Sequence, residues 1–347
     1  MAESARRRRP VLRDERVTLA HGAGGKATRD LVEALFLEEL GNEALAPLGD
    51  SAVVPPVGGR LALTTDSYVV RPLVFPGGDI GELAVNGTVN DLAVAGARPL
   101  WLMAGFVLEE GLPVERLREI VRSLGAAATR AGVPVAAGDT KVVERGKADG
   151  LYVTTAGVGV LEHDLELVPG RVRAGDRVLL SGTLADHGMA VMIARGDLHL
   201  EGDVASDTAP VHELAARLLE LGESLRWMRD PTRGGLATAL NELVAQAPLA
   251  VRLRESALPV RPAVFAACEI LGIDPLYVAN EGKLVAVVAS EAADDALAAL
   301  HSLPLGADAV EIGTVEAEPE GIVLLDTALG GSRIVDLLVG DPLPRIC

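Results

Sequence analysis

The sequence is poor in aromatic residues and in cysteine. Aromatic residues make up 3% of the 347 positions whereas apolar residues make up 49%, so the core must be built mainly from Ala, Val and Leu. Only two cysteines are present, which excludes a disulfide framework and fits a reducing compartment. The sequence has neither a signal segment nor an apolar run of about 18 residues, the length of a membrane-spanning helix. We therefore expect a cytoplasmic protein with no membrane partner.

Basic residues are scarce relative to acidic ones. The formal net charge is -17 at pH 7, which argues against nucleic acid or an anionic membrane as the main partner, because both bind basic surfaces. The one basic run, Arg6–Arg9, lies in a polar N-terminal segment with no apolar stretch behind it. We interpret residues 1–17 as a disordered, solvated arm rather than a binding patch.

The length of the chain predicts two domains, because it exceeds what one typical core accommodates. A polar, turn-rich stretch at residues 169–176 marks their boundary. The expected organisation is an N-terminal domain at residues 18–168, a C-terminal domain at 169–335 and a mobile tail at 336–347.

Both halves of the sequence mix the periodicity of helices with that of strands. Helices are predicted near residues 26–40, 80–97, 114–131, 185–194, 209–221, 235–245, 262–271 and 292–300. Strands are predicted near residues 51–55, 61–65, 100–108, 133–137, 152–160, 177–180, 250–253, 284–288, 310–314 and 321–325. The order lacks the regular strand–helix alternation and the glycine fingerprint of a dinucleotide-binding fold, so we predict two α+β domains.

One polar pattern recurs in the N-terminal half, an aspartate at a strand end or turn beside small or hydroxyl residues. Its members are Asp50, Asp66, Asp91 and Asp139, the last followed by Thr140. Any one of them alone is more often a turn residue than a ligand. Four together favour a Mg²⁺ site, because this cation binds oxygen ligands and usually substrate phosphates as well. Asn86 and Asn90 support a site here, because they add polar groups to an otherwise apolar helix.

A glycine-rich loop precedes the first predicted helix. Gly24 and Gly25 leave backbone N–H groups unhindered at a helix N-terminus, and Lys26 adds a positive charge, which together suit a phosphate. The loop is not a Walker A motif, because alanine occupies positions 20 and 27 where that motif needs Gly and Ser or Thr. The alternative interpretation is a hinge.

Two motifs of the second half complete the candidate site. Asp230 and Thr232 lie with two arginines in a loop suited to anionic oxygens. Glu281 lies in a turn between an apolar helix and an apolar strand. Burial there would raise the pKa of its carboxyl and suit it to act as a base, whereas the alternative is an exposed turn glutamate.

Together these motifs resemble the ATP-dependent family of aminoimidazole ribonucleotide synthetase, selenophosphate synthetase and thiamine monophosphate kinase. Within it the chain is similar to the HypE family of [NiFe] hydrogenase maturation. The resemblance is carried by residues 21–26, 64–67, 75–81, 86–92, 138–143, 230–235, 280–283 and 344–347. The first seven stretches mark the wider family, and the terminal Pro-Arg-Ile-Cys marks the hydrogenase maturation members.

The resemblance implies an activity, cofactors and partners. The N-terminal domain would bind ATP with Mg²⁺ and pair across a homodimer. The carbamoyltransferase HypF would load a carbamoyl group onto Cys347. The chain would use ATP to dehydrate this group to a thiocyanate, and would pass the cyanide to iron on a HypC–HypD scaffold. The tail from Asp336 to Cys347 spans twelve residues and could reach on the order of 40 Å when extended.

The resemblance also implies residue roles. Cys347 would carry the substrate, Glu281 would be the base, and either Lys141 or Lys26 would offset charge on the transferred phosphoryl group, with Lys141 favoured. The expected metal ligands are Asp50, Asp66, Asp91 and Asp139. The expected cofactor-binding residues are these four together with Gly24, Gly25, Lys26, Asn86, Asn90, Thr140, Asp230 and Thr232.

Two alternative functions follow from the same motifs. One is a small-molecule ATP-dependent synthetase or kinase of the wider family, which would have no use for Cys347. The other is a non-catalytic scaffold that binds nucleotide and presents its tail to partners. Loss of one water from carbamoylated Cys347 in the presence of ATP would distinguish the carbamoyl dehydratase from both.

Overall fold

The computed structural model describes residues 11–49, 51–196, 203–338 and 345–347. Its N-terminal half is built on a four-stranded sheet with the order β1-β6-β4-β5. The strands are β1 (Arg60–Tyr68), β4 (Arg98–Glu109), β5 (Val135–Val143) and β6 (Leu151–Leu161). β6 pairs antiparallel with both of its neighbours, whereas β4 and β5 are parallel. β1 and β5 therefore form the two edges of this sheet.

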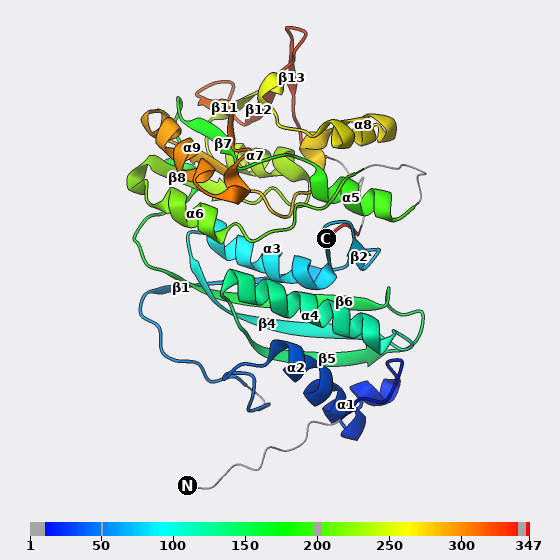
Figure 1. The fold of residues 1–347 in the computed structure, drawn as a ribbon. Coiled ribbons are helices and arrows are strands. Elements are labelled where there is room, and N and C mark those ends of the chain that lie inside the picture. The colour runs from blue at the N-terminus through cyan, green and yellow to red at the C-terminus, as the bar shows by residue number, and fades with distance from the viewer. Residues whose placement is uncertain (1–10, 50, 197–202, 339–344) are drawn as a thin grey trace.

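Two long helices, α3 (Ile80–Val94) and α4 (Val114–Ala131), cover one face of the sheet (Figure 1). α4 is amphipathic and ends where Gly132 adopts a left-handed conformation with φ 67°. α3 is buried almost all round, because it lies between the sheet and the C-terminal half (Figure 1). The apolar residues of α3 therefore pack against both the sheet and the C-terminal half, and asparagine and aspartate interrupt them.

Short elements lie near the β5 edge and form the segment before α3. Those near β5 are a 3-10 turn (Leu19–Gly22), α1 (Lys26–Leu31), a π-helical turn (Val32–Phe36) and α2 (Leu37–Leu40). A two-stranded ribbon, β2 (Val74–Phe75) with β3 (Gly78–Asp79), leads into α3. The side chain of Asp79 caps α3, because it accepts hydrogen bonds from the N–H groups of Gly81 and Glu82.

The C-terminal half contains a seven-stranded sheet with the order β13-β12-β9-β11-β7-β10-β8. Its strands are β7 (Arg177–Leu180), β8 (Leu225–Arg229), β9 (Ala250–Arg254), β10 (Val285–Val288), β11 (Val310–Glu316), β12 (Ile322–Asp326) and β13 (Ser332–Ile334). Its helices are α5 (Asp186–Ala194), α6 (His212–Leu219), α7 (Gly235–Gln246), α8 (Pro262–Leu271) and α9 (Ala293–His301). All four residues of β10 are buried, as expected for a central strand without alternation.

The predicted α+β class is confirmed, and the structure corrects several details of the predicted elements, among them the following two. Residues 51–55 do not form a strand, because Pro55 and Pro56 remove the N–H donors that would extend it. The sequence prediction missed β8, whose alternation of apolar and charged residues spans only five positions. Within the described ranges, no helix combines the length and the apolarity needed to cross a membrane. The last residue lies near α5 and β2 (Figure 1).

Candidate active site

Four acidic side chains from both halves of the chain meet where α3 contacts the C-terminal half. We call them the carboxylate cluster: Asp66 on β1, Asp91 on α3, Asp230 after β8 and Glu281 before β10. Their charges interact, because the other three carboxylates each raise the pKa of Glu281. Two of the four aspartates predicted as metal ligands therefore lie together, joined by two acids of the second half.

Asp66 and Asp91 are held by crossed hydrogen bonds between β1 and α3. Thr88 on α3 donates to Asp66 over 2.9 Å, and Thr64 on β1 donates to Asp91 over 2.6 Å. Strand alternation places Thr64 and Asp66 on the face that α3 covers, which explains the spacing of this motif. Burial and, next, the charge of Asp66 raise the pKa of Asp91. Bringing these two carboxylates together costs free energy that a bound cation would offset.

Glu281 is buried, with 2% of its surface exposed, so the exposed-turn interpretation is wrong. Asp207 holds its loop, because the N–H groups of Glu281 and Gly282 each donate to an Asp207 carboxylate oxygen over 3.2 Å. Burial, followed by repulsion from Asp207 and the other acids, raises the pKa of Glu281 well above its ordinary value. A carboxylate in this position is a stronger base than an exposed one.

Asp207 is a site residue that the sequence analysis missed. Lys283 forms an ion pair with it at 3.1 Å, and both side chains are almost fully buried. Although burial acts to raise the pKa of Asp207, the charge of Lys283 and the hydrogen bond from the N–H of Glu281 bring it below its ordinary value. The sequence does mark Asp207, because Ser206 and Thr208 flank it in the same pattern as the four predicted aspartates.

Asn86 and Asn90 join the two halves of the protein. Asn90 donates to the carbonyl groups of Glu281 and Ala209 over 3.0 and 3.1 Å and accepts from the N–H of Val211 over 2.7 Å. Asn86 donates to the Thr208 hydroxyl over 3.0 Å. In this structure these amides hold the C-terminal half on α3 and place the backbone of Glu281.

Asp230 and Thr232 lie on the loop that opens α7, against the Glu281 loop. Asn280 joins the two loops, because its side chain donates to the carbonyl of Pro231 over 2.9 Å. Asp230 is 8% exposed, and burial followed by the charge of Asp91 raises its pKa from 3.8 to about 7. The environment of Asp230 therefore favours its protonated form more than an exposed position would.

We expect Asp230→Asn to stabilise the ligand-free protein at pH 8 by on the order of 2–4 kcal/mol. Because the folded-state pKa is raised from 3.8 to about 7, the acid contributes its full stability below pH 4 and loses it as the pH rises through 7. The asparagine variant avoids this loss, so its advantage should vanish toward pH 4. Urea unfolding from pH 4 to 8 measures the difference, with the exposed Asp308→Asn as a control that follows the wild type.

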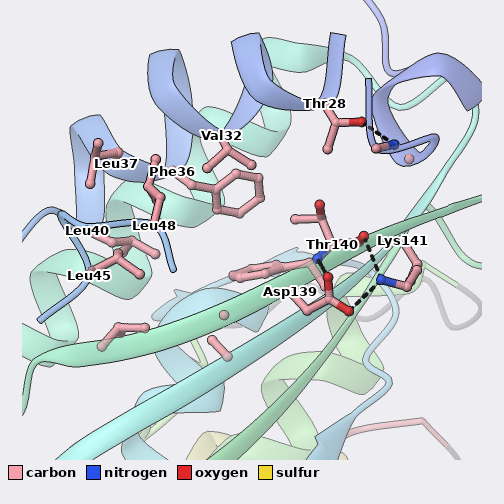
Figure 2. A pocket seen from close by; sticks show the side chains of 16 residues that line it. Thr28, Val32, Phe36, Leu37, Leu40, Leu45, Leu48, Asp139, Thr140 and Lys141 are labelled. Atoms are coloured by element: carbon pink, nitrogen blue, oxygen red, sulfur yellow. Dashed lines mark hydrogen bonds and ion pairs between the residues drawn. The ribbon is translucent and has the colours of Figure 1, made fainter. Parts of the chain in front are cut away.

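The predicted glycine loop borders a pocket of about 250 Å³ (Figure 2). Gly24 has φ 79°, a backbone conformation that suits glycine, and its N–H donates to the Thr28 hydroxyl over 2.9 Å. One side of the pocket is apolar and is lined by Val32, Phe36, Leu37, Leu40, Leu45 and Leu48. The other side presents Gly22, Gly24, Thr28, Asp139, Thr140 and Lys141. An apolar wall facing backbone amides and a lysine suits a nucleotide.

The two lysines considered for phosphate differ in position. Lys141 lines the pocket and forms an ion pair with Asp139 at 2.5 Å (Figure 2). Lys26 lies on the surface of α1, where its side chain is 85% exposed and pairs with Asp30. Gly25 caps the start of α1. The geometry thus favours Lys141 over Lys26.

The predicted metal set is not gathered within the described part of one chain. Asp139 lies on β5 and Asp66 on β1, the opposite edges of the four-stranded sheet, and the side chain of Asp139 is 70% exposed. Strand order is not encoded in local sequence, which is why the motif spacing could not show this separation. Asp50 lies outside the described residues. No group of three or more described His, Cys, Asp or Glu side chains is arranged to hold a metal ion.

The described end of the tail docks just beyond β1, the strand that carries Asp66. Ile346 is 5% exposed, and the N–H of Val69 donates to the carbonyl of Cys347 over 3.3 Å. The neighbouring Tyr68 is buried, and burial followed by the charges of Asp66 and Glu281 raises the pKa of its phenol. Cys347 packs against the hydrophobic core. Val69, which follows the strand that carries Asp66, therefore holds the cysteine that the sequence singled out.

Comparison with known proteins agrees with this geometry. Residues 48–161 match the AIR synthase related protein N-terminal domain, and residues 173–326 match the corresponding C-terminal domain. The carbamoyl dehydratase HypE of Bradyrhizobium diazoefficiens is 54% identical over 344 residues, covering 99% of each chain.

Solved structures give the same result. A crystal structure of the hydrogenase maturation protein HypE in complex with ATP superposes with a TM-score of 0.91 at 45% identity, covering 95% of this chain and 99% of that one. The HypE–HypF complex superposes with a TM-score of 0.78 at 46% identity, covering 89% and 99%. The chain therefore belongs to the AIR synthase related family and, within it, to the carbamoyl dehydratase HypE proteins of hydrogenase maturation.

Proposed function

We propose that this chain uses ATP to dehydrate an S-carbamoyl group on Cys347 to a thiocyanate and then donates the cyanide to the iron of a [NiFe] hydrogenase precursor. The carbamoyl oxygen attacks the γ-phosphoryl group, and ADP leaves. The carbon–oxygen bond then breaks, inorganic phosphate carries the oxygen away, and loss of both N–H protons forms the nitrile. The products are the thiocyanate, ADP and phosphate, so one water is lost from the protein.

The observation that carries this proposal is the position of the tail. Val69 binds the carbonyl of Cys347, and the adjacent Tyr68 shares an electrostatic environment with Glu281. A substrate built on this cysteine would therefore lie next to Tyr68, a residue that senses the charge of the buried Glu281. Glu281 would accept a nitrogen proton as the nitrile forms, and its raised pKa makes it a better acceptor. A small-molecule synthetase has no use for this cysteine, and a passive scaffold has no use for a base.

Asp66 and Asp91 fit a Mg²⁺ site, because they are hard oxygen ligands that repel each other. Mg²⁺ would offset the charge of the phosphate oxygens when bound. Asp66 and Asp91 would orient the triphosphate toward the Glu281 loop, and Asp230 and Thr232 would border it. The pocket beside Gly24 would receive the adenosine, with Lys141 near the phosphates.

A homodimer would bring together the carboxylate cluster and the pocket residues Asp139 and Lys141, which lie apart within one chain. The face of the four-stranded sheet opposite α3 carries unpartnered apolar side chains, with Leu61 56% and Leu63 73% exposed on β1. Trp101 and Met103 on β4 extend this face. Pairing it with a second copy would bury apolar area and bring Asp139 and Lys141 of one chain toward Asp66 of the other. The complete metal and nucleotide site would then belong to the dimer.

The partners follow from the chemistry of the tail. HypF, which forms a complex with a HypE of 46% identity, would carbamoylate Cys347 while the tail is outside the site. A HypC–HypD scaffold would hold the iron that accepts cyanide. The cytoplasmic setting expected from the sequence would keep Cys347 a thiol between cycles.

Intact-protein mass spectrometry tests this function. Carbamoylated protein is expected to lose about 18 Da, one water, after addition of ATP and Mg²⁺. Cys347→Ala accepts no carbamoyl group and should show no such loss, whereas Cys268→Ala should behave as the wild type because Cys268 is a buried core residue. ATP turnover that is unaffected by Cys347→Ala would support a small-molecule enzyme instead.

A further inference from the structure

The last three residues are held by a set of backbone contacts outside the carboxylate cluster. The carbonyl of Arg345 accepts hydrogen bonds from the Arg195 guanidinium over 2.5 Å and from the N–H of Arg71 over 3.3 Å. The guanidinium of Arg345 forms an ion pair with Asp149 at 2.6 Å. The carbonyl of Ile346 lies 2.6 Å from Nε2 of His187. Of these contacts, only the one to His187 is fully buried.

The hydrogen bonds around His187 define its tautomer. A carbonyl oxygen only accepts, so Nε2 carries the proton and donates it to Ile346. Nδ1 must then accept, and it lies 2.8 Å from the hydroxyl of Ser206. The Ser206 hydroxyl oxygen already accepts a hydrogen bond from the N–H of Thr208 over 3.1 Å. The hydroxyl proton is therefore the one that Ser206 donates to Nδ1 of His187. The ring of Phe75 packs edge-on at 87° and fixes the plane of the imidazole.

His187 is also tied to the loop that carries Glu281. It lies in the first turn of α5, where Ala185 precedes the helix in a left-handed conformation. The N–H of Ala185 donates to the side chain of Asn280 over 2.8 Å, and the N–H of Gly188 donates to the carbonyl of Ala279 over 3.2 Å. Two hydrogen bonds therefore connect the start of α5 to the Glu281 loop. His187 therefore connects the tail, through the start of α5, to the loop that carries Glu281.

We propose that His187 is a positioning residue for the C-terminal cysteine. Its Nε2–H holds the carbonyl of Ile346 and so sets both the fraction of time that Cys347 spends at the carboxylate cluster and its register against Glu281. In this role it acts through the backbone of the tail. This inference rests on the proposed function, since it gives the docked tail its catalytic purpose. Arg345 contributes to docking at the rim, where exposed ion pairs add little.

Two measurements on His187→Leu test the role. Without ATP, the rate of Cys347 alkylation by iodoacetamide, followed by peptide mass spectrometry, should rise about five- to tenfold, the range that one buried hydrogen bond controls. With the carbamoylated protein and saturating ATP, single-turnover loss of water should fall by a similar factor. His187→Gln keeps an N–H donor and should restore part of both rates. ATP affinity should stay within twofold of the wild type.

Two controls separate positioning from loss of structure. Cys268, buried with 1% exposure, reports general loosening in the same digest, and its alkylation should not change. His301 also bonds a backbone carbonyl, that of Ala309 at 2.8 Å, but lies away from the tail, so His301→Leu should match the wild type. If His187→Leu does not fold, Ser206→Ala, which removes the donor to Nδ1, provides the same comparison with an expected change of about threefold.

The outcomes are distinct. Rates within twofold of the wild type in the His187 and Ser206 variants, or equal effects in His301→Leu, overturn the positioning role. Parallel exposure of Cys268 overturns it as well, because the effect is then structural. If the wild type itself loses no water, the proposed function fails, while the alkylation measurement still decides whether His187 holds the tail.

Discussion

Glu281→Gln is expected to slow the loss of water from carbamoylated Cys347 by about 10²–10⁴-fold, the usual contribution of a general base. Glutamine preserves the size of the side chain and its place in the loop held by Asp207, but it cannot accept a proton from the nitrogen. Burial and neighbouring acids raise the pKa of Glu281, so the substitution removes a carboxylate that is more basic than an exposed one. Single-turnover mass spectrometry with saturating ATP measures the rate.

Stability and binding distinguish this result from misfolding. A raised pKa means that Glu281 destabilises the fold as the pH rises through that pKa, so the glutamine variant should be at least as stable as the wild type at pH 8. ATP affinity should be nearly unchanged. The matched control is Glu242→Gln on α7, which removes a half-exposed carboxylate paired with Arg229 of β8 and should leave the rate unaffected. A Glu281→Gln rate above one third of the wild type contradicts the assignment.

The pH profile provides an independent check on the base. In the wild type, the rate of water loss should fall as the pH drops through the raised pKa of Glu281, because the protonated acid cannot accept a proton. Glu281→Gln should lack this limb. If both proteins show the same fall, another group titrates.

The local motifs could be predicted from the sequence, because each is a short strand, turn or helix start with its own residue pattern. Thr64 and Asp66 alternate on a strand, and Glu281 lies between an apolar helix and an apolar strand. Which motifs meet depends on strand order, which is set by long-range pairing. The sequence therefore grouped Asp139 with Asp66, although they lie on opposite edges of one sheet.

The contacts of the tail could not be predicted for a related reason. Arg345 and Ile346 are held mainly through their carbonyl groups, which every residue possesses. His187 follows an aspartate in an apolar helix, and nothing nearby marks it as a partner of the last residues. Asp207 was the exception, since its serine and threonine neighbours repeat a pattern already recognised. Side-chain patterns are readable from sequence, whereas backbone recognition needs the fold.

Mixing two inactive variants is expected to restore activity if the site spans a homodimer. Lys141→Ala removes the lysine at the β5 edge, and Glu281→Gln removes the base in the carboxylate cluster. In a mixed dimer, one site combines the intact Glu281 of one chain with the intact Lys141 of the other, and the second site has lost both. With random exchange about half of the dimers are mixed and half of their sites are intact, so activity should return to about one quarter of the wild type.

The mass spectrum identifies which chain reacts. Because the tail docks beside its own Glu281, only the Lys141→Ala chains should lose water, and about half of them should do so, while the Glu281→Gln chains stay carbamoylated. The matched control is a mixture of Asp66→Asn chains with Glu281→Gln chains. Each chain then carries a defect in its own carboxylate cluster, so a mixed dimer contains no intact site. If native mass spectrometry shows mixed dimers and neither chain loses water, Lys141 and Glu281 do not act across an interface between two copies.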